Sequence, residues 1–146
     1  MPIAPARQRH TEVSGVATPR SFPSFSGYSS PFMPTFAQTL DLVDDAERIA
    51  EYDRYHAHVW PEVVAGLHTI GITSMHLFRT GTRLFMVYEA PASFNPARDY
   101  QRYADDPRCQ AWDDLMQTFQ RPIPTAREGE WWTPMDLLFA LEHPAP

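Results

Sequence analysis

Apolar and polar residues alternate over residues 35–43, where Phe36 and Leu40 stand on the apolar side. A period of two puts alternate side chains on opposite faces of a strand, so this segment is predicted to be a strand with one buried face. The same argument predicts two strands over residues 72–80 and 83–90. Only a short turn containing a glycine separates them, which indicates a β-hairpin.

Between the first strand and the hairpin, apolar residues over 49–67 follow the period of an α-helix. Asp44 or Asp45 is placed to cap its start, and Gly71 to end it. The stripe is interrupted at Pro61, because a proline inside a helix removes a hydrogen bond and clashes with the preceding turn. Two helical pieces are therefore predicted, with Pro61 as the first residue of the second.

The C-terminal third is predicted to hold a second helical region and a last strand. Ser93 or Asn95 starts the helical region, and Pro107 divides it into two pieces. Residues 120–134 contain several prolines and no regular period, which indicates an irregular segment. The apolar run over residues 135–142 is then predicted to be the fourth strand.

The order of these elements, β-α-β-β-α-β, is that of a ferredoxin-like α+β domain. Such a domain has a four-stranded antiparallel sheet with both helical regions on one face. Phe36, Phe85, Val87 and Leu138 suggest that the other face also carries apolar residues. A bare apolar face needs a cover, and a second copy of the chain is the commonest one. A homodimer, in a dimeric α/β barrel-type assembly, is therefore expected.

Residues 1–32 differ from the rest of the chain, because they contain five prolines, six serines and no helical or strand period. Ordering such a segment would cost entropy and bury little apolar surface, so it is predicted to be a disordered extension. Met33 is an alternative start of the chain. The domain is therefore assigned to residues 33–146.

The composition is that of a globular protein, with 43% hydrophobic and 21% charged residues in a chain of 146. A formal net charge of −6 argues against nucleic acid as a partner, because phosphate binding needs a basic surface. No apolar run is long enough to cross a membrane, so no membrane partner is expected. Cys109 is the one cysteine, which excludes an intrachain disulfide and fits a reducing cytoplasm.

Residues 51–62 concentrate the candidate chemistry, with two tyrosines, two histidines, a tryptophan and three carboxylates. Tyr52 and His56 are four residues apart and lie on one face of the predicted helix, close to the break at Pro61. An imidazole beside a phenol at a helix break suits proton-transfer chemistry. The alternative is that His56 is a partly buried, hydrogen-bonded core residue.

A metal site is not expected from the spacing of the histidines. His56 and His58 are two residues apart, which turns them about 200° from each other on a helix, so they cannot share a metal there. His68 or His76 could add a ligand in three dimensions, but nothing in the spacing demands it. The chain also has no Gly-rich phosphate loop and no Gly-x-Ser-x-Gly elbow for a serine nucleophile.

Trp112 is followed by two acids, Asp113 and Asp114. Adjacent helix residues point in different directions, so at most one acid faces a pocket well; otherwise both lie on a solvated helix face. Trp112 is either a core residue or a sugar platform, because an aromatic ring stacks on the C–H face of a pyranose. Together with His56 and Tyr52, these residues would make a fair carbohydrate site.

The string Tyr52-x-x-x-His56-x-x-x-Trp60-Pro61-Glu62 resembles the signature of the L-rhamnose mutarotase family. The resemblance covers most of residues 35–120 and does not include residues 1–32. Further matching positions are Gly71, the end of the hairpin at residues 85–89, and residues 109–112.

The resemblance implies a dimeric ferredoxin-like domain that interconverts the α and β anomers of a 6-deoxy sugar without a cofactor. His56 matches the family's catalytic histidine, Tyr52 its substrate-binding tyrosine, and Trp112 the first of two adjacent substrate-contacting tryptophans. The second tryptophan is Asp113 here, and Met75 stands where the rhamnose enzymes carry a substrate-contacting tyrosine. Because both departures fall on the sugar pocket, L-fucose is a candidate substrate beside L-rhamnose.

The expected function is therefore that of an aldose 1-epimerase, or mutarotase. His56 is expected to be the general acid/base, since an imidazole with a pKa near neutrality can give or take a proton. Tyr52 would orient His56 or the substrate. Asp113 would bind a sugar hydroxyl whose orientation differs from that in L-rhamnose, and it is a candidate second proton carrier.

Two other functions stay open from the sequence. A small ferredoxin-like monooxygenase, cofactor-free or haem-degrading, would share the same order of elements. Bound haem or oxygen uptake would identify it. A non-catalytic sugar-binding module would bind a sugar without speeding anomer exchange, and it would have no need of the titratable His56.

Overall fold

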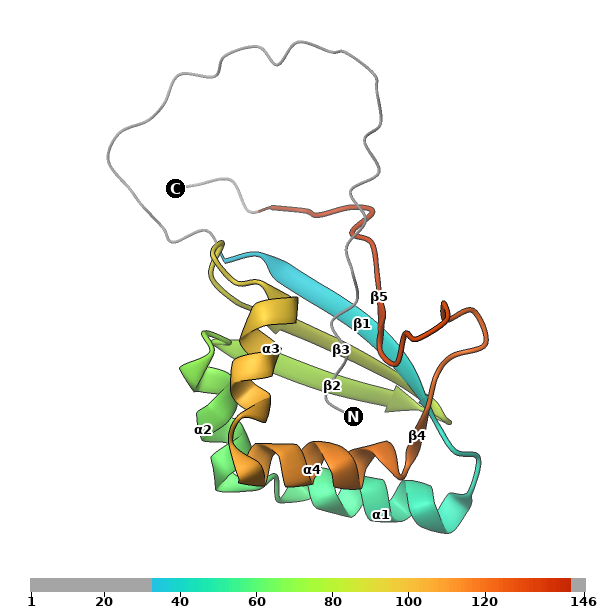
Figure 1. The fold of residues 1–146 in the computed structure, drawn as a ribbon. Helices are drawn as coiled ribbons and strands as arrows, with labels where there is room; N and C mark the ends of the chain where they lie inside the picture. Colours follow the sequence, from blue (N-terminus) through green and yellow to red (C-terminus); the bar gives the residue numbers. More distant parts are fainter. Residues whose placement is uncertain (1–32, 143–146) are drawn as a thin grey trace, which may run out of the picture.

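The computed structural model of the chain describes residues 33–142, and five strands form one antiparallel sheet within them (Figure 1). Their bounds are β1 Thr35–Leu42, β2 Ser74–Thr80, β3 Arg83–Glu89, β4 Gln120–Arg121 and β5 Thr133–Pro134. The order across the sheet is β2-β3-β1-β4, and β5 also pairs with β1. β1 is therefore a central strand, with β3 along one edge and the two short strands along the other.

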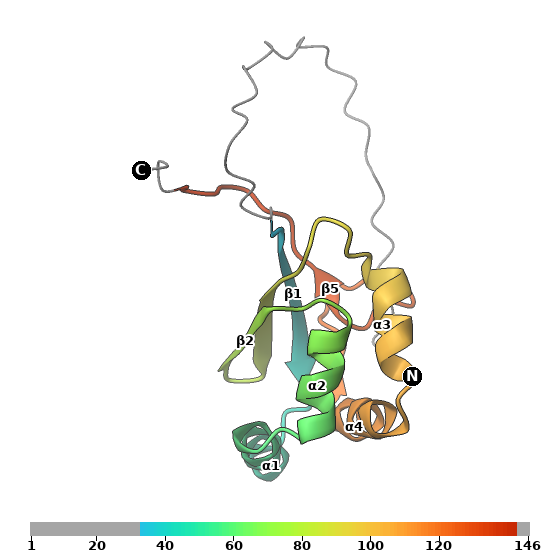
Figure 2. The same ribbon diagram turned by 90° about the vertical axis from the view of Figure 1, so that its left-hand side faces the viewer.

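Helices lie on one face of this sheet, as the two perpendicular views show (Figure 2). Their bounds are α1 Ala46–Ala57, α2 Pro61–Thr69, α3 Pro96–Ala104 and α4 Pro107–Gln117. Each of the two predicted helical regions thus consists of two helices divided at a proline. The predicted ferredoxin-like α+β fold is confirmed.

The break between α1 and α2 follows from local chemistry. The carboxylate of Asp45 caps α1 by accepting two backbone N–H groups of its first turn. Trp60 is extended, with ψ of 136°, as expected of a residue before proline, and Pro61 begins α2. Gly71 follows α2 with φ of +103°, a left-handed conformation that favours glycine.

α3 and α4 begin in the same way as each other. The side chain of Asn95 caps α3 and that of Asp106 caps α4, and a proline is the first residue of each helix. The turn between β2 and β3 holds Gly81, with φ of +56°. The predicted hairpin is therefore confirmed, and of the two candidate caps for α3 the structure uses Asn95.

The core lies between the sheet and the helices. On β1 the buried residues that face the helices are Leu40 and Leu42, and the register pairs Leu40 with Leu84 of β3. Alternation along β3 puts Leu84 and Tyr88 on this same face. The helices contribute aromatic and sulfur-containing side chains to the core: Tyr52, Tyr100, Tyr103, Cys109, Trp112 and Met116.

The opposite face of the sheet carries part of the apolar surface predicted for it. Alternation places Phe85 and Val87 there, and the ring of Phe78 on β2 stacks on Phe85 with centroids 6.0 Å apart. Phe78 is 55% exposed. The prediction was wrong for Phe36, which lies on the helix face and stacks on Tyr88 with centroids 5.1 Å apart.

The predicted fourth strand over residues 135–142 is wrong. These residues form no strand, and Leu138, expected on the bare face, is 95% exposed. The backbone N–H of Met135 donates to the oxygen of Ala37, near the first residue of β1, so few residues of β1 are left for a longer strand to pair with. The pairing occurs earlier in the chain, at β4 and β5, inside the segment predicted to be irregular.

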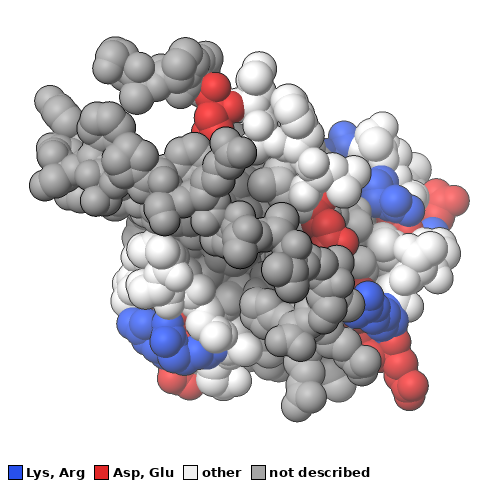
Figure 3. Space-filling model, turned by 90° about the horizontal axis from the view of Figure 1, so that it is seen from above, with Lys and Arg blue, Asp and Glu red and all other residues white. Residues whose placement is uncertain are grey.

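The surface of the described residues shows acidic and basic side chains close to each other in the view from above (Figure 3). Within residues 33–142 no helix is long and apolar enough to span a membrane. Residues 1–32, predicted to be a disordered extension, lie outside the described residues.

Candidate active site

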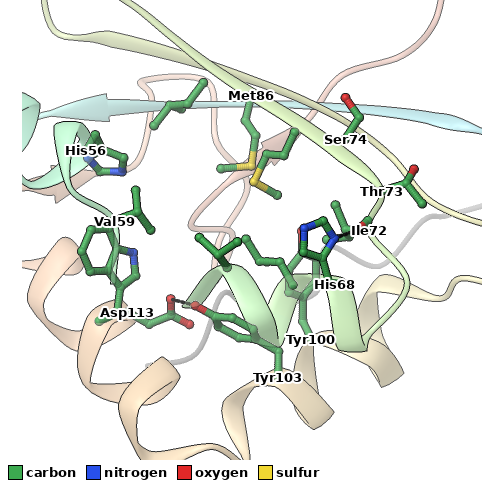
Figure 4. A pocket seen from close by; sticks show the side chains of 15 residues that line it. His56, Val59, His68, Ile72, Thr73, Ser74, Met86, Tyr100, Tyr103 and Asp113 are labelled. Atoms are coloured by element: carbon green, nitrogen blue, oxygen red, sulfur yellow. Dashed lines mark hydrogen bonds between the residues drawn. The ribbon is translucent and has the colours of Figure 1, made fainter. Parts of the chain in front are cut away.

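A pocket of about 450 Å³ opens between the sheet and the helices (Figure 4). A smaller pocket of about 60 Å³ shares part of its wall, including His56, Trp112 and Asp113. Met75 lines the larger pocket, and Tyr52 lines the smaller one. The structure thus brings the five candidate residues together around one connected site, from α1, β2 and α4.

His56 lies in the last turn of α1 and is half-buried. Its Nδ1 atom is 2.9 Å from the main-chain oxygen of Tyr52. A carbonyl oxygen only accepts, so Nδ1 carries the proton and donates it, and in the neutral ring Nε2 is left with its lone pair. The imidazole is held between two rings, with centroid distances of 4.3 Å to Tyr52 and 5.4 Å to Trp112.

Burial lowers the pKa of His56 below its usual 6.5. The hydrogen bond to the Tyr52 carbonyl and the charge of Asp53 act in the opposite direction but do not cancel the effect of burial. At neutral pH the imidazole is therefore mostly neutral. In that form Nε2 can accept a proton, which is what a general base requires.

Tyr52 is 2% exposed, and burial raises the pKa of its phenol to about 12. It therefore stays protonated at neutral pH. Its Oη atom accepts a hydrogen bond of 3.2 Å from the side-chain amide of Gln120, on β4. Gln120 in turn accepts a 3.0 Å hydrogen bond from the indole N–H of Trp131.

Asp113 points into the site from α4 and is 6% exposed, so it is the one of the two adjacent acids that enters the pocket. Its Oδ1 accepts a long hydrogen bond of 3.4 Å from the Tyr103 hydroxyl (Figure 4), and its Oδ2 is buried with no partner among residues 33–142. Burial raises the pKa of Asp113 to about 7; the charge of Asp114 adds to the rise, and the Tyr103 hydroxyl opposes it. A large share of Asp113 is therefore protonated at neutral pH and can act as an acid.

Trp112 is buried and packs edge-on against His56 and Trp60, with centroids 5.4 and 5.3 Å apart. It is both a core residue and part of the pocket wall, so the two interpretations of its sequence position are compatible. Met75 is half-buried on β2, across the larger pocket from the helices. The wall around it is largely apolar, with Leu67, Ile72, Leu77 and Met86.

Several lining residues were missed by the sequence argument. Tyr100 and Tyr103 line the larger pocket, although no pattern in the sequence marked them as site residues. His68 also lines it, with Nδ1 hydrogen-bonded at 3.0 Å to the Ile72 oxygen. Gln120 lies in the segment predicted to be irregular, where no sequence pattern marked it. Within residues 33–142 no three His, Cys, Asp or Glu side chains are grouped to hold a metal ion.

A family model and the sequence of one relative both indicate a family of sugar mutarotases. The sequence model of the family described as L-rhamnose mutarotase matches residues 35–141. A UPF0734 protein of Dictyostelium discoideum is 49% identical over 112 residues, which cover 74% of this chain and 90% of that protein. The L-fucose mutarotase of Xanthomonas campestris pv. campestris is 44% identical over 111 residues, 75% of this chain and 89% of its own.

Two solved structures share the fold. The L-rhamnose mutarotase of Formosa agariphila superposes with a TM-score of 0.55 and 18% identity, over 75% of this chain and 99% of its own. The tetracenomycin F2 cyclase of Streptomyces glaucescens, a type II polyketide cyclase, gives 0.51 and 18%, over 76% and 99%. At this identity the likeness establishes the fold alone, since one fold serves unrelated activities.

Proposed function

Because the chain belongs to the L-rhamnose mutarotase family and is thus a sugar mutarotase, an isomerase, we propose that it interconverts the α and β anomers of a 6-deoxy-L-sugar with His56 as the general acid/base. The observation that carries the proposal is the pairing of two groups in one pocket. His56 is a neutral imidazole with Nε2 available, and Asp113 is a buried carboxyl with a raised pKa. One suits the removal of a proton and the other suits its donation.

The reaction needs these two transfers in each direction. In ring opening, Nε2 of His56 takes the proton of the anomeric hydroxyl while Asp113 gives a proton to the ring oxygen, and the bond from C1 to the ring oxygen breaks. The aldehyde then rotates about the C1–C2 bond. In ring closure the protons return along the same routes and the ring oxygen attacks the other face of C1. Each positioned acid or base is worth about 10²–10⁴ in rate.

The larger pocket has the size and character of a site for a small ligand, at about 450 Å³ with a largely apolar wall. That wall suits the C6 methyl group of a 6-deoxy sugar, and the ring of Trp112 suits its C–H face. Asp113 is proposed to bind a sugar hydroxyl as well as to transfer a proton. The 44% identity to an L-fucose mutarotase favours L-fucose over L-rhamnose as the preferred substrate.

The chain is also proposed to form a homodimer. The face of the sheet opposite the helices carries Phe78, Phe85 and Val87, and the ring of Phe78 is largely exposed. Burying such a surface against a second copy stabilises both chains by removing apolar area from water. The pocket lies on the helix side of the sheet, so each copy would keep its own site.

The test is saturation-difference proton NMR of the anomeric signals of L-fucose and L-rhamnose. Wild-type protein is expected to transfer saturation between the α and β signals of at least one sugar, and the faster sugar names the substrate. His56→Ala should abolish the transfer. His58→Ala is the matched control, because His58 is exposed at the end of α1 and lines neither pocket of the site. Full activity of His56→Ala, or sugar binding without exchange by the wild type, would reject the proposal.

A further inference from the structure

Gln120 connects the site to the segment between α4 and β5. It belongs to the two-residue strand β4, pairs with Leu42 of β1, and is 8% exposed. Its side chain makes two hydrogen bonds: Oε1 accepts from the indole N–H of Trp131 at 3.0 Å, and Nε2 donates to Oη of Tyr52 at 3.2 Å. All three residues line the smaller pocket together with His56.

The chemistry of these groups fixes the direction of the chain of hydrogen bonds. An indole N–H can only donate, so the amide oxygen of Gln120 must face Trp131. The amide nitrogen must then face Tyr52, and since that nitrogen can only donate, the phenol oxygen accepts. The hydroxyl proton of Tyr52 is therefore free for another acceptor. Among residues 33–142 the structure gives it none.

We propose that Gln120, held by Trp131, is a positioning residue that turns the Tyr52 hydroxyl proton toward an oxygen of the bound substrate. This inference rests on the proposed mutarotase function and deepens it. It assigns to the segment after α4 a role in orienting the sugar, so that its anomeric hydroxyl meets His56. It also explains why a polar side chain is buried on β4, because its two hydrogen bonds satisfy its polar atoms.

The experiment compares Gln120→Glu and Gln120→Met with Tyr52→Phe, in the full chain, by rates of anomer exchange across pH. An ionised carboxylate can only accept, so Gln120→Glu would take hydrogen bonds from both Trp131 and Tyr52 and draw the phenol proton away from the pocket. Below its own pKa the same carboxyl has an O–H donor and imitates glutamine. Relative to wild type at the same pH, Gln120→Glu is therefore expected to keep its kcat/KM at low pH and to lose about tenfold as its carboxyl ionises, reaching the level of Tyr52→Phe.

Gln120→Met should give an intermediate loss, because the phenol proton can then point either way. His56, Asp113 and, where it is present, the Tyr52 phenol are titratable groups that face the same pocket. The pH profile of Gln120→Met, which keeps all three and has no carboxyl at position 120, is therefore the reference for the additional pH effect of Gln120→Glu. Gln101→Glu, on the exposed surface of α3, is the matched control and should behave as wild type. Circular dichroism of each variant checks the fold.

A double-variant comparison separates positioning from a merely structural role. In the Tyr52→Phe background, Gln120→Glu should have no further effect, because no hydroxyl is left to turn. An active wild type together with an unaffected Gln120→Glu, or with an equal loss in both backgrounds, would overturn the role of Gln120 alone. An inactive wild type would instead overturn the mutarotase function, and this role with it.

Discussion

The Nδ1 atom of His56 lies 2.9 Å from the main-chain oxygen of Tyr52, one turn earlier in α1. This contact fixes the ring so that the base, when neutral, is Nε2. Burial lowers the pKa of His56 and raises that of Asp113 to about 7, so the two groups are driven toward the forms that a base and an acid need. The pH dependence of the reaction should report both.

The first prediction is a bell-shaped profile of kcat/KM. The base form of His56 exists above its pKa, which burial lowers from the usual 6.5, so activity should fall at a pH more acidic than that usual value. The acid form of Asp113 exists below its pKa, so activity should also fall above about 7. Asp113→Asn should remove the alkaline limb and lower the rate by about 10²–10⁴. Polarimetry or NMR at a series of pH values measures the rate of anomer exchange.

The control for this profile is Asp114→Asn. The negative charge of Asp114 raises the pKa of Asp113. Removing that charge should therefore keep both limbs of the pH profile and move the alkaline limb to slightly lower pH. An Asp113→Asn enzyme with an unchanged alkaline limb would show that another group is the acid.

The second prediction concerns stability, on which Asp113→Asn should have the opposite effect to its effect on the rate. The pKa of Asp113 is raised from 3.8 to about 7 in the folded chain, so its protonated form is favoured by folding. Stability is therefore lost as pH rises through this range, by up to roughly 4 kcal/mol for three pKa units at about 1.4 kcal/mol each. Asp113→Asn should be more stable than wild type at pH 8, and the advantage should shrink toward pH 4. Urea unfolding at both pH values tests this; a variant equally destabilised at both would contradict it.

The third prediction concerns the choice of sugar. Met75 lies on β2 in the apolar wall of the larger pocket. A tyrosine there would add a hydroxyl and a larger ring, as the resemblance implies for rhamnose enzymes. Met75→Tyr should therefore lower kcat/KM for L-fucose by about tenfold or more relative to L-rhamnose, since losing one well-placed contact costs roughly 1–2 kcal/mol. Met75→Leu keeps the apolar wall and should keep the wild-type preference. Equal effects of Met75→Tyr on both sugars would exclude Met75 from sugar selection.

Sequence reasoning located the local structure well wherever a residue dictates its own backbone. Pro61 and Pro107 divide helices at the predicted places, and Gly81 forms the predicted hairpin turn. The Tyr52 and His56 pair was found because four-residue spacing on a helix is a contact by itself. These features depend on neighbours within one or two turns.

Features that depend on distant partners were not found. The apolar period of residues 135–142 resembles a strand, but pairing requires an edge, and β1 begins at Thr35. Gln120 reaches Tyr52 and accepts from Trp131 only because β4 lies beside β1. The burial that shifts the pKa of Asp113 likewise comes from packing that no local pattern encodes.

The fourth prediction concerns Gly66, which lies inside α2 against α4. A Cβ atom at this position would be 2.7 Å from Sγ of Cys109 and 3.1 Å from the Tyr103 ring. Alanine normally stabilises a helix by about 1 kcal/mol relative to glycine. Here the cost of overpacking should exceed the gain in helix propensity, so Gly66→Ala should destabilise the fold by about 1–3 kcal/mol. Because Tyr103 donates to Asp113, activity should fall as well.

The control for Gly66→Ala removes the atom that the added Cβ would approach too closely. Cys109→Ala removes Sγ, so Gly66→Ala should cost less in that background than in wild type, and the double-mutant cycle should show a coupling energy. Thermal or urea unfolding of the four proteins gives the numbers. Additive losses would show that the close approach to Cys109 does not limit this position.

The fifth prediction concerns the proposed dimer. Phe78 is 55% exposed on the face opposite the helices, and its ring stacks on Phe85. A charge placed there would be buried without a partner if a second copy covers the face, which costs several kcal/mol. Phe78→Arg should therefore convert the dimer to a monomer in light scattering after size exclusion. Gln101→Arg adds the same charge to the exposed surface of α3, in the helix layer, and should leave the dimer intact.

The rate of anomer exchange by the Phe78→Arg monomer then shows whether the site needs the second copy. The residues of the pocket come from the four helices, the sheet and the loops between them in one chain, on the side away from Phe78. The monomer should therefore keep anomer exchange, although with lower stability because its apolar sheet face now meets water. If Phe78→Arg stays dimeric, the copies meet through another surface. If the monomer folds but loses all exchange, the second copy is needed to complete the site.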